Sequence, residues 1–268
     1  MARLAILAGQ GALPHLIAAA RPEALFAMFE GVAVDVPPNE TLVVSYERFG
    51  EMFNALHAKG VTEVVFAGSL ARPVLDPSRF DAKTQELAPR FFAAMQGGDD
   101  GLLRTVVGAF EEHGFQVRGA HEIAEDLTAA PGLLAGAEPS AQDAKDIARA
   151  QAVLDALGAQ DVGQGVVVAA GQVLGIETAQ GTDAMLRFVA ETPEALRKAG
   201  KGVLVKGAKP EQELRVDMPT IGPKTIELAA AAGLAGVIID AGRVLLIDRA
   251  AILAAAERLG LFLLAKAR

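Results

Sequence analysis

Residues 4–14 read Leu-Ala-Ile-Leu-Ala-Gly-Gln-Gly-Ala-Leu-Pro, and this stretch indicates the class of fold. Residues 4–8 are a continuous apolar run, which is typical of a strand buried on both faces of a parallel sheet. Gly9, Gln10, Gly11 and Ala12 then form a turn before a helix-like segment. Such a turn can hold a phosphate on backbone N–H groups. The motif is neither a complete G-x-G-x-x-G nor a Walker sequence, so the glycines alone favour a tight turn that binds nothing.

Two further strands are indicated in the first half, at residues 42–44 and 64–67, with helical spacing of apolar residues between them. Strands that alternate with helices predict an α/β fold, here an N-terminal Rossmann-like domain with a parallel sheet. Gly68 and Ser69 leave the end of one strand, as Gly9 leaves another. Since ligands bind beyond the carboxyl ends of such strands, we expect both loops to face one crevice, with ordinary loop residues as the alternative.

Composition excludes several classes of protein. The chain has 268 residues, 51% of them apolar, and a net charge of −8, which argues against general nucleic-acid binding. The absence of cysteine excludes disulfides, thiolate zinc sites and cysteine nucleophiles. The first apolar run is too short for a signal peptide, and no stretch approaches the length of a transmembrane helix. We therefore expect a soluble, cytoplasmic protein, and peripheral contact with the inner membrane is left open.

Two polar pairs stand at element boundaries in the first half. Asp99 and Asp100 precede an amphipathic helix, where one carboxylate is expected to cap the helix and ligand contact is the second interpretation. His121 and Glu122 follow a short strand at residues 114–119 and are either ligand contacts or a helix start. The histidines lack metal-ligand spacing, which disfavours a histidine zinc site.

The second half has a different pattern. Residues 128–139 lack periodicity and are a candidate linker, so we place a boundary between domains 1–134 and 135–268. Residues 164–177 and 237–247 each suggest a hairpin, and residues 261–264 suggest a final strand. The C-terminal domain is therefore expected to be mixed α/β.

The most polar loop of this half covers residues 206–222 and reads Lys-Gly-Ala-Lys-Pro-Glu-Gln-Glu-Leu-Arg-Val-Asp-Met-Pro-Thr-Ile-Gly. Its cations, Lys206, Lys209 and Arg215, are candidate phosphate ligands. Its carboxylate Asp217, together with Asp183 beside Thr182 at a helix start, suits a hard cation such as Mg²⁺. Side chains that could bind sugar, base or phosphate oxygens are Gln164, Gln212 and Thr220. A solvated surface loop is an equally good interpretation of this segment alone.

Several stretches together resemble one protein family. They are Ala-Gly-Gln-Gly-Ala-Leu-Pro at residues 8–14, Phe-Ala-Gly-Ser-Leu-Ala-Arg-Pro at 66–73, Gly-Asp-Asp-Gly-Leu-Leu-Arg at 98–104, Gly-Ala-His-Glu at 119–122, Asp-Val-Gly-Gln-Gly at 161–165, Glu177 with residues 181–187, and residues 206–222. In this order they resemble the LpxI-type UDP-2,3-diacylglucosamine pyrophosphatases of lipid A biosynthesis.

The resemblance implies that water cleaves the diphosphate of UDP-2,3-diacylglucosamine, giving UMP and 2,3-diacylglucosamine 1-phosphate (lipid X), with Mg²⁺ or Mn²⁺ as cofactor. The family's essential aspartate, in its Arg-Val-Asp-x-Pro-Thr-Ile-Gly motif, corresponds to Asp217, which we assign as catalytic residue and metal ligand, with Asp183 as a second metal ligand. We expect substrate contacts from Gly9, Gln10, Gly11, Ala12, Gly68, Ser69, Asp99, Asp100, His121, Glu122, Gln164, Thr182, Asp183, Lys206, Lys209, Gln212, Arg215 and Thr220. The resemblance also implies two domains around a cleft. A homodimer is left open, and no nucleic acid is expected.

Two rival functions remain at this point. A non-catalytic carrier or sensor of a nucleotide-linked lipid would bind the same ligand without turnover. A dinucleotide-dependent oxidoreductase would rest only on the first strand, turn and helix, and no clear acidic residue is apparent at the end of a second strand.

Overall fold

The chain divides into two compact units. The computed structural model describes residues 2–71, 73–95, 99–197, 200–210 and 212–268, although not the side chains of Asp99 and Asp100. One unit consists of Met1–Glu125 together with Glu213–Asp217, and the other of Asp126–Gln212 together with Met218–Arg268. The units therefore separate before the boundary expected at residues 134 and 135. The expected cleft between the domains stays a prediction.

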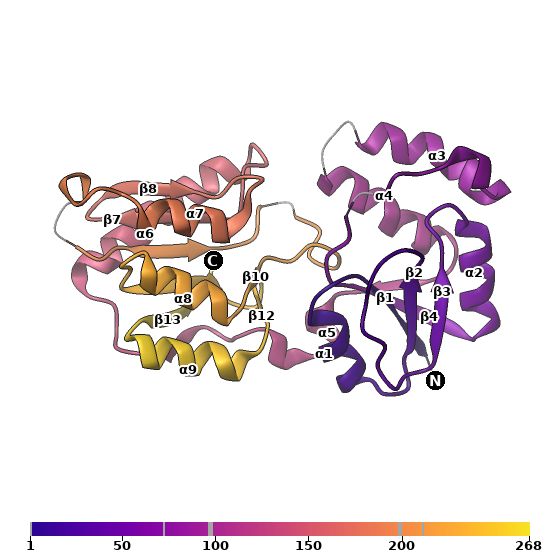
Figure 1. The fold of residues 1–268 in the computed structure, drawn as a ribbon, viewed down its shortest axis with the longest axis horizontal. Helices are drawn as coiled ribbons and strands as arrows, with labels where there is room; N and C mark the ends of the chain where they lie inside the picture. Colours follow the sequence, from indigo (N-terminus) through magenta and orange to yellow (C-terminus); the bar gives the residue numbers. More distant parts are fainter. Residues whose placement is uncertain (1, 72, 96–98, 198–199, 211) are drawn as a thin grey trace. The chain divides into compact units, whose positions relative to one another are not determined.

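Unit 1 is built on a parallel sheet (Figure 1). Its elements are β1 (Arg3–Ala8), α1 (Leu13–Ala20), β2 (Leu25–Phe29), β3 (Thr41–Val44), α2 (Phe49–Ala58), β4 (Val61–Ala67), α3 (Ala82–Met95), α4 (Asp99–Glu112), β5 (Gln116–Arg118) and α5 (Ala120–Ile123), with a 3₁₀ turn at Pro77–Arg79. In the described residues the strand order is β3-β2-β1-β4-β5, and every neighbouring pair is parallel. The direction of strand order reverses between β1 and β4, which is the point where doubly wound sheets bind ligands.

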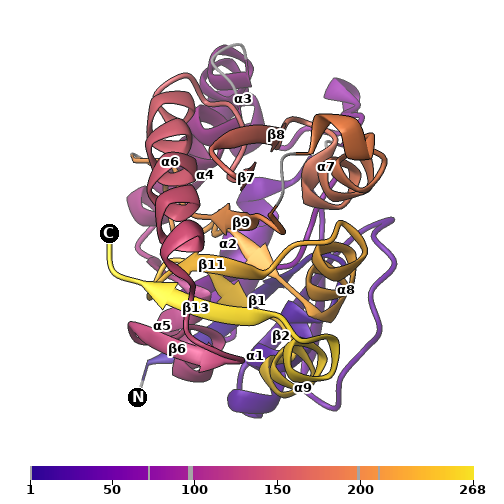
Figure 2. The ribbon, with the colours of Figure 1, turned by 90° about the vertical axis from the view of Figure 1, so that its left-hand side faces the viewer.

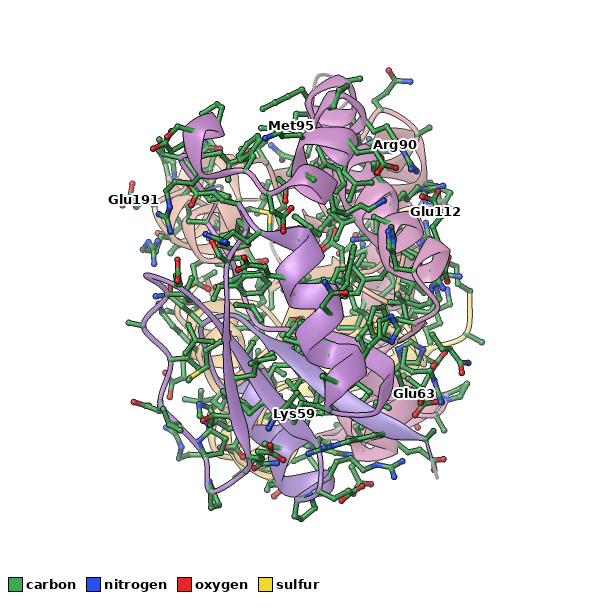
Figure 3. All side chains as sticks on the ribbon, turned by 90° about the vertical axis from the view of Figure 1, so that its right-hand side faces the viewer. Lys59, Glu63, Arg90, Met95, Glu112 and Glu191 are labelled. Atoms are coloured by element: carbon green, nitrogen blue, oxygen red, sulfur yellow. The ribbon has the colours of Figure 1, made fainter. Side chains whose placement is uncertain are left out.

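Aromatic rings fill one side of this sheet. Phe53 of α2 meets Phe110 of α4 edge-on at a centroid distance of 5.1 Å and also packs on Phe115. Helices α3 and α4 are joined at the surface, where Arg90 donates two hydrogen bonds to Glu112, at 2.7 and 2.9 Å (both residues labelled in Figure 3). This packing holds α4 against the sheet. Helix α4 also carries Glu111, which pairs with Arg215 in the loop at residues 206–222.

Unit 2 contains a mixed sheet. Its elements are a 3₁₀ turn at Glu125–Leu127 that spans the boundary, β6 (Gly132–Ala135), α6 (Ala141–Gly158), β7 (Gly165–Ala169), β8 (Gln172–Ile176), α7 (Gly181–Ala190), a 3₁₀ turn (Glu194–Leu196), β9 (Val203–Lys206), β10 (Thr220–Ile221), α8 (Pro223–Ala231), β11 (Gly236–Asp240), β12 (Leu245–Leu246), α9 (Arg249–Leu259) and β13 (Phe262–Lys266). The main sheet has the order β6-β13-β11-β9-β7-β8 in the described residues. Strands β13, β11 and β9 are parallel, and the flanking pairs are antiparallel.

Alternation along β9 divides the core of unit 2 between the faces of the sheet. Val203 and Val205 pack with Ile147 and Leu154 of α6, whereas Leu204 packs with residues of α7, α8 and α9. Figure 2 shows α6 on one side of the strands and α7, α8 and α9 on the other. Because side chains of a strand alternate between faces, the central strands β7, β9 and β11 are buried along their whole length, and they are apolar except for the last residue of β9 and of β11.

The structure confirms some expectations for this half and corrects others. Strands β7 and β8 form the expected antiparallel hairpin, and β13 is the expected final strand. The candidate linker at residues 128–139 contains β6, which pairs with β13. The hairpin expected at residues 237–247 is wrong: β11 lies between β9 and β13 in the main sheet, whereas β12 pairs in parallel with β10.

Two helix starts that the sequence indicated are present in the structure. Ser140 and Asp143 form the capping box of α6, and Asp248 accepts a hydrogen bond from the Ala251 N–H to cap α9. In the described part of the chain no helix combines the length and the apolar character that a membrane crossing requires.

Candidate functional site

The loops that follow β1 and β4 are joined backbone to backbone at the topological switch point of unit 1. The Gly9 N–H donates to the Ala67 carbonyl at 2.7 Å, and Gln10 and Ser69 exchange hydrogen bonds of 2.8 and 2.9 Å. The two loops thus face one crevice, as the strand order requires. The N–H groups of Gly9 and Gln10, which we expected to bind phosphate, are used in this pairing.

Two glycines make this close approach sterically possible. A Cβ atom on Gly9 would lie 2.6 Å from the Ser69 carbonyl oxygen, and one on Gly68 would lie 2.5 Å from the Gln10 carbonyl oxygen. Gly68 also has a φ of +89°. The backbone donors left for an anion are those at the start of α1, where Gly11 and Ala12 are exposed and the first N–H groups lie outside the helix's own hydrogen bonds.

His121 and Glu122 lie at the start of α5, directly after β5. Burial alone would raise the pKa of Glu122, but hydrogen bonds from Arg118 and from the Gly119 N–H outweigh it and lower that pKa. Glu122 therefore caps the helix, which was the alternative to ligand binding. The Nδ1 atom of His121 is buried and has no hydrogen-bond partner in the described part of the chain, and the contact of His121 with a ligand stays a prediction.

The remaining candidate from the first half is the pair Asp99 and Asp100. Helix α4 begins at Asp99, as expected, but both side chains lie outside the described residues. Arg72, in the loop after β4, lies outside them as well. Their contacts with substrate stay predictions.

In unit 2 a buried polar cluster consists of Lys206, Glu177 and Thr182. Lys206 at the end of β9 is 4% exposed, and its Nζ lies 3.3 Å from both carboxylate oxygens of Glu177. The Thr182 hydroxyl accepts from the same Nζ and donates to Glu177 at 2.9 Å. The ammonium that we expected to bind phosphate is therefore paired inside the unit, and any phosphate contact would have to compete with Glu177.

The first part of the polar loop is folded on itself. The side-chain oxygen of Gln212 accepts from the Lys209 N–H at 3.0 Å, and Lys209 Nζ forms an ion pair with Asp161. The Gln164 carbonyl accepts from the Gly207 N–H at 3.0 Å. Lys209, Gln164 and Gln212 thus lie in one region of unit 2, and Gln212 is buried and stabilises the turn.

The second part of the loop, Glu213–Asp217, belongs to unit 1. Arg215 donates to Glu111 of α4 at 2.6 Å and to Glu213 at 2.8 and 2.9 Å, and Val216 packs against the aromatic core of unit 1. Hydrogen bonds to both carboxylates raise the pKa of Arg215, and those from Arg215 lower the pKa of Glu213 despite its burial. Arg215, an expected phosphate ligand, thus anchors the segment.

Asp217 is the last residue of that anchored segment. Its backbone N–H donates to the Glu213 carbonyl at 3.0 Å, and its side chain is half-buried. The stretch at residues 206–222 is continuous in sequence but is divided between the two units. Residues 213–217, and with them Asp217, belong to unit 1, whereas Lys206, Lys209 and Thr220 belong to unit 2.

The expected metal ligands do not form a complete protein site within either unit. Asp183 belongs to unit 2 and makes an ion pair of 2.7 Å with Lys224, and Thr220 is exposed at the start of β10. Among the described residues no group of three or more histidines or carboxylates could hold a metal ion. Mg²⁺ at phosphate sites usually takes one or two carboxylates, with water and substrate phosphates as the other ligands, so Asp217 fits that pattern.

Sequence reasoning missed a buried carboxylate at the end of β11 and an acidic residue at the end of β2. Asp240 is 2% exposed and accepts from Arg268 at 3.0 Å and from the Ala208 N–H at 3.2 Å. Burial raises the pKa of Asp240, and the charge of Arg268 opposes that rise. Glu30 directly follows β2, a strand that we did not predict; the apolar run at residues 25–29 before Glu30 and Gly31 was the available signal.

Fold and site together define a class: a two-unit α/β protein with a Rossmann-like unit, a mixed-sheet unit, and polar groups gathered where parallel strands end. The sequence matches the LpxI N-terminal domain over residues 3–127 and the LpxI C-terminal domain over residues 130–264. It is also 43% identical to the UDP-2,3-diacylglucosamine pyrophosphatase LpxI of Caulobacter vibrioides, over 98% of this chain and 97% of that protein. The chain belongs to the LpxI family.

Proposed function

We propose that this protein hydrolyses the diphosphate of UDP-2,3-diacylglucosamine to UMP and 2,3-diacylglucosamine 1-phosphate, a step of lipid A biosynthesis. The observation that carries the proposal is the 43% identity to a UDP-2,3-diacylglucosamine pyrophosphatase over nearly the full length of both chains. Because both family domains are present, the chain includes the parts that the activity of such a relative would require.

The chemistry requires a water molecule to attack phosphorus while the bridging P–O bond breaks. Asp217 is the carboxylate to which we assign this step, either by accepting the proton of the attacking water or by holding a divalent cation. Mg²⁺ or Mn²⁺, when bound by Asp217 and the substrate phosphates, would neutralise the charge that develops on the phosphate oxygens. Metal dependence is part of the proposal.

The other groups of the chain have supporting roles in this account. Arg215 fixes the backbone that carries Asp217, because both sides of its guanidinium are held by carboxylates of unit 1. Lys209 and the N-terminal turn of α1 offer positive charge and backbone donors for phosphate oxygens. Asp183 as a further metal ligand would have to leave Lys224.

Purified protein incubated with UDP-2,3-diacylglucosamine tests the proposal directly. UMP and the sugar 1-phosphate should appear in equal amounts, the reaction should stop with a chelator, and added Mg²⁺ or Mn²⁺ should restore it. Saturable binding of the substrate without release of UMP, at any metal concentration, would instead support the carrier function.

A further inference from the structure

Unit 1 contains a polar pocket to which no role has been assigned so far. Its volume is about 310 Å³, and its lining residues include Gln10 after β1, Glu30 after β2, Tyr46 and Glu47 after β3, and Ser69 after β4. All of them lie in Met1–Glu125, so the pocket is formed by one unit. It opens where the parallel strands end, beside the switch point between β1 and β4.

Glu30 occupies an informative position. In doubly wound sheets an acidic residue at the end of the second strand binds ribose hydroxyls, while the phosphate lies at the first helix N-terminus. Glu30 immediately follows β2, which pairs in parallel with β1. Gln10, on the pocket wall, is followed directly by Gly11 and Ala12 at the start of α1. Gln10 on the wall of the pocket, where the sugar is expected, is therefore adjacent in sequence to the start of α1, where the phosphate is expected.

Tyr46 provides a second, independent observation. Its ring stacks on Phe29 with a centroid distance of 4.1 Å and an angle of 6°, while its hydroxyl is buried and has no hydrogen-bond partner among the residues that the structure describes. An unpaired buried hydroxyl is unfavourable, and native proteins usually pair such groups. Burial raises the pKa of Tyr46 to about 12, so the phenol stays neutral and can donate a hydrogen bond at neutral pH.

The charges of the pocket favour hydroxyl groups over an anion. Arg79 bridges two carboxylates, with 2.9 Å to Glu30 and 3.0 Å to Glu47, and Glu47 also accepts from the Asp76 N–H at 2.9 Å. Among the described residues that line the pocket, one cation lies between two carboxylates, a negative balance that would repel a phosphate. Carboxylate oxygens accept more than one hydrogen bond, so they can still receive sugar hydroxyls.

We propose that this pocket binds the nucleoside end of the substrate, with the ribose hydroxyls on Glu30 and Tyr46 and the adjoining phosphate directed towards the start of α1. The inference deepens the proposed function and rests on it for the identity of the nucleotide. It assigns recognition of the nucleoside to unit 1 alone.

Tyr46 also makes the proposal easy to test, since it is the only tyrosine of the chain and there is no tryptophan. Full-length protein labelled with ¹³C-tyrosine gives one set of ring signals in an NMR spectrum. Titration with UMP and with uridine should move this signal saturably. Inorganic phosphate should leave it in place, and 2′,3′-dideoxyuridine should bind at least about tenfold more weakly than uridine, because it lacks the hydroxyl groups.

Conservative variants identify the contacts by calorimetry. Tyr46→Phe and Glu30→Gln should each weaken UMP binding by about five- to thirtyfold, because the first removes a buried hydroxyl and the second replaces a carboxylate oxygen that accepts hydrogen bonds with an amide NH₂. In turnover they should raise KM more than they lower kcat, because the reacting phosphates are not touched. Glu23→Gln changes an exposed carboxylate outside the pocket and should bind UMP as the unaltered protein does.

The outcomes separate this inference from the proposed function. UMP that shifts Tyr46 without hydrolysis of the lipid substrate would preserve the pocket assignment and contradict the enzyme. Hydrolysis with an unmoved Tyr46 signal and unchanged UMP affinity in both variants would preserve the enzyme and overturn the pocket assignment. An equal shift with inorganic phosphate alone would also overturn it, because the pocket would then be an anion site.

Discussion

The two units end their parallel strands in different ways. In unit 1 the loops after β1 and β4 are joined by backbone hydrogen bonds, and the polar pocket beside them keeps a tyrosine hydroxyl that no other described residue pairs with. In unit 2 the ends of β9 and β11 are occupied by buried charges, Lys206 with Glu177 and Asp240 with Arg268. The comparison teaches that a similar sheet edge can be left available for a ligand or be filled by the protein's own ion pairs.

We expect the largest loss in free energy of unfolding when the buried ammonium of Lys206 is removed from the end of β9 in unit 2. Lys206→Met leaves the Glu177 carboxylate, 8% exposed, without its ammonium partner. Breaking a buried pair in this way costs about 3–5 kcal/mol. Urea unfolding measures it, and Lys224→Met is the matched control: its pair with Asp183 is at the surface and should contribute about 0–1 kcal/mol. Equal losses in the two variants would contradict the description of the unit 2 edge.

A smaller effect is expected at the backbone contact of unit 1. Gly9→Ala places a methyl group 2.6 Å from the Ser69 carbonyl oxygen, a group that cannot rotate away. Overpacking of this kind costs about 1–3 kcal/mol. Thermal unfolding should show the loss.

The control for that prediction lies in α4. Gly108→Ala meets nothing within 4 Å in the middle of a helix, so it should stabilise the protein by about 0.5–1 kcal/mol. If Gly9→Ala were as stable as the unaltered protein, the two loops would have to separate easily, and the close backbone contact would not be an essential feature of unit 1.

The smallest effect is expected at the segment that anchors Asp217, where the charges are partly exposed. Arg215 lowers the pKa of Glu213, so this stabilisation is present above the unfolded value of about 4.3 and is lost as pH falls through the folded pKa. Unfolding free energies at pH 6 and pH 3.5 should differ less in Glu213→Gln than in the unaltered protein, by under about 1 kcal/mol. An unchanged pH dependence would show that Arg215 does not hold Glu213 in solution.

Local patterns were sufficient for much of the fold. The buried apolar runs of β1 and β4, the turn between β7 and β8, and the caps at Ser140 and Asp248 are all read from neighbouring residues. The second hairpin was wrong because β11 and β12 are separated by a turn-like Asp-Ala-Gly-Arg sequence, yet each pairs with a distant strand. Pairing partners far along the chain leave no local signal.

The same limit explains the site. Arg215 looked like a free cation in sequence, because its partner Glu111 is 104 residues away. Lys206 looked free for the same reason, with Glu177 29 residues away. The identities of polar residues in the loops were therefore predictable, whereas which charges are already neutralised inside a unit required the structure.

The most direct test of the central claim is the rate of UMP release by Asp217→Asn, with Glu227→Gln on the surface of α8 as the matched control. We expect kcat to fall by about a thousandfold in Asp217→Asn, as for the loss of a catalytic carboxylate, with unfolding and UMP binding unchanged and with normal turnover in Glu227→Gln. A folded Asp217→Asn protein that releases UMP from UDP-2,3-diacylglucosamine at the unaltered rate would contradict the account.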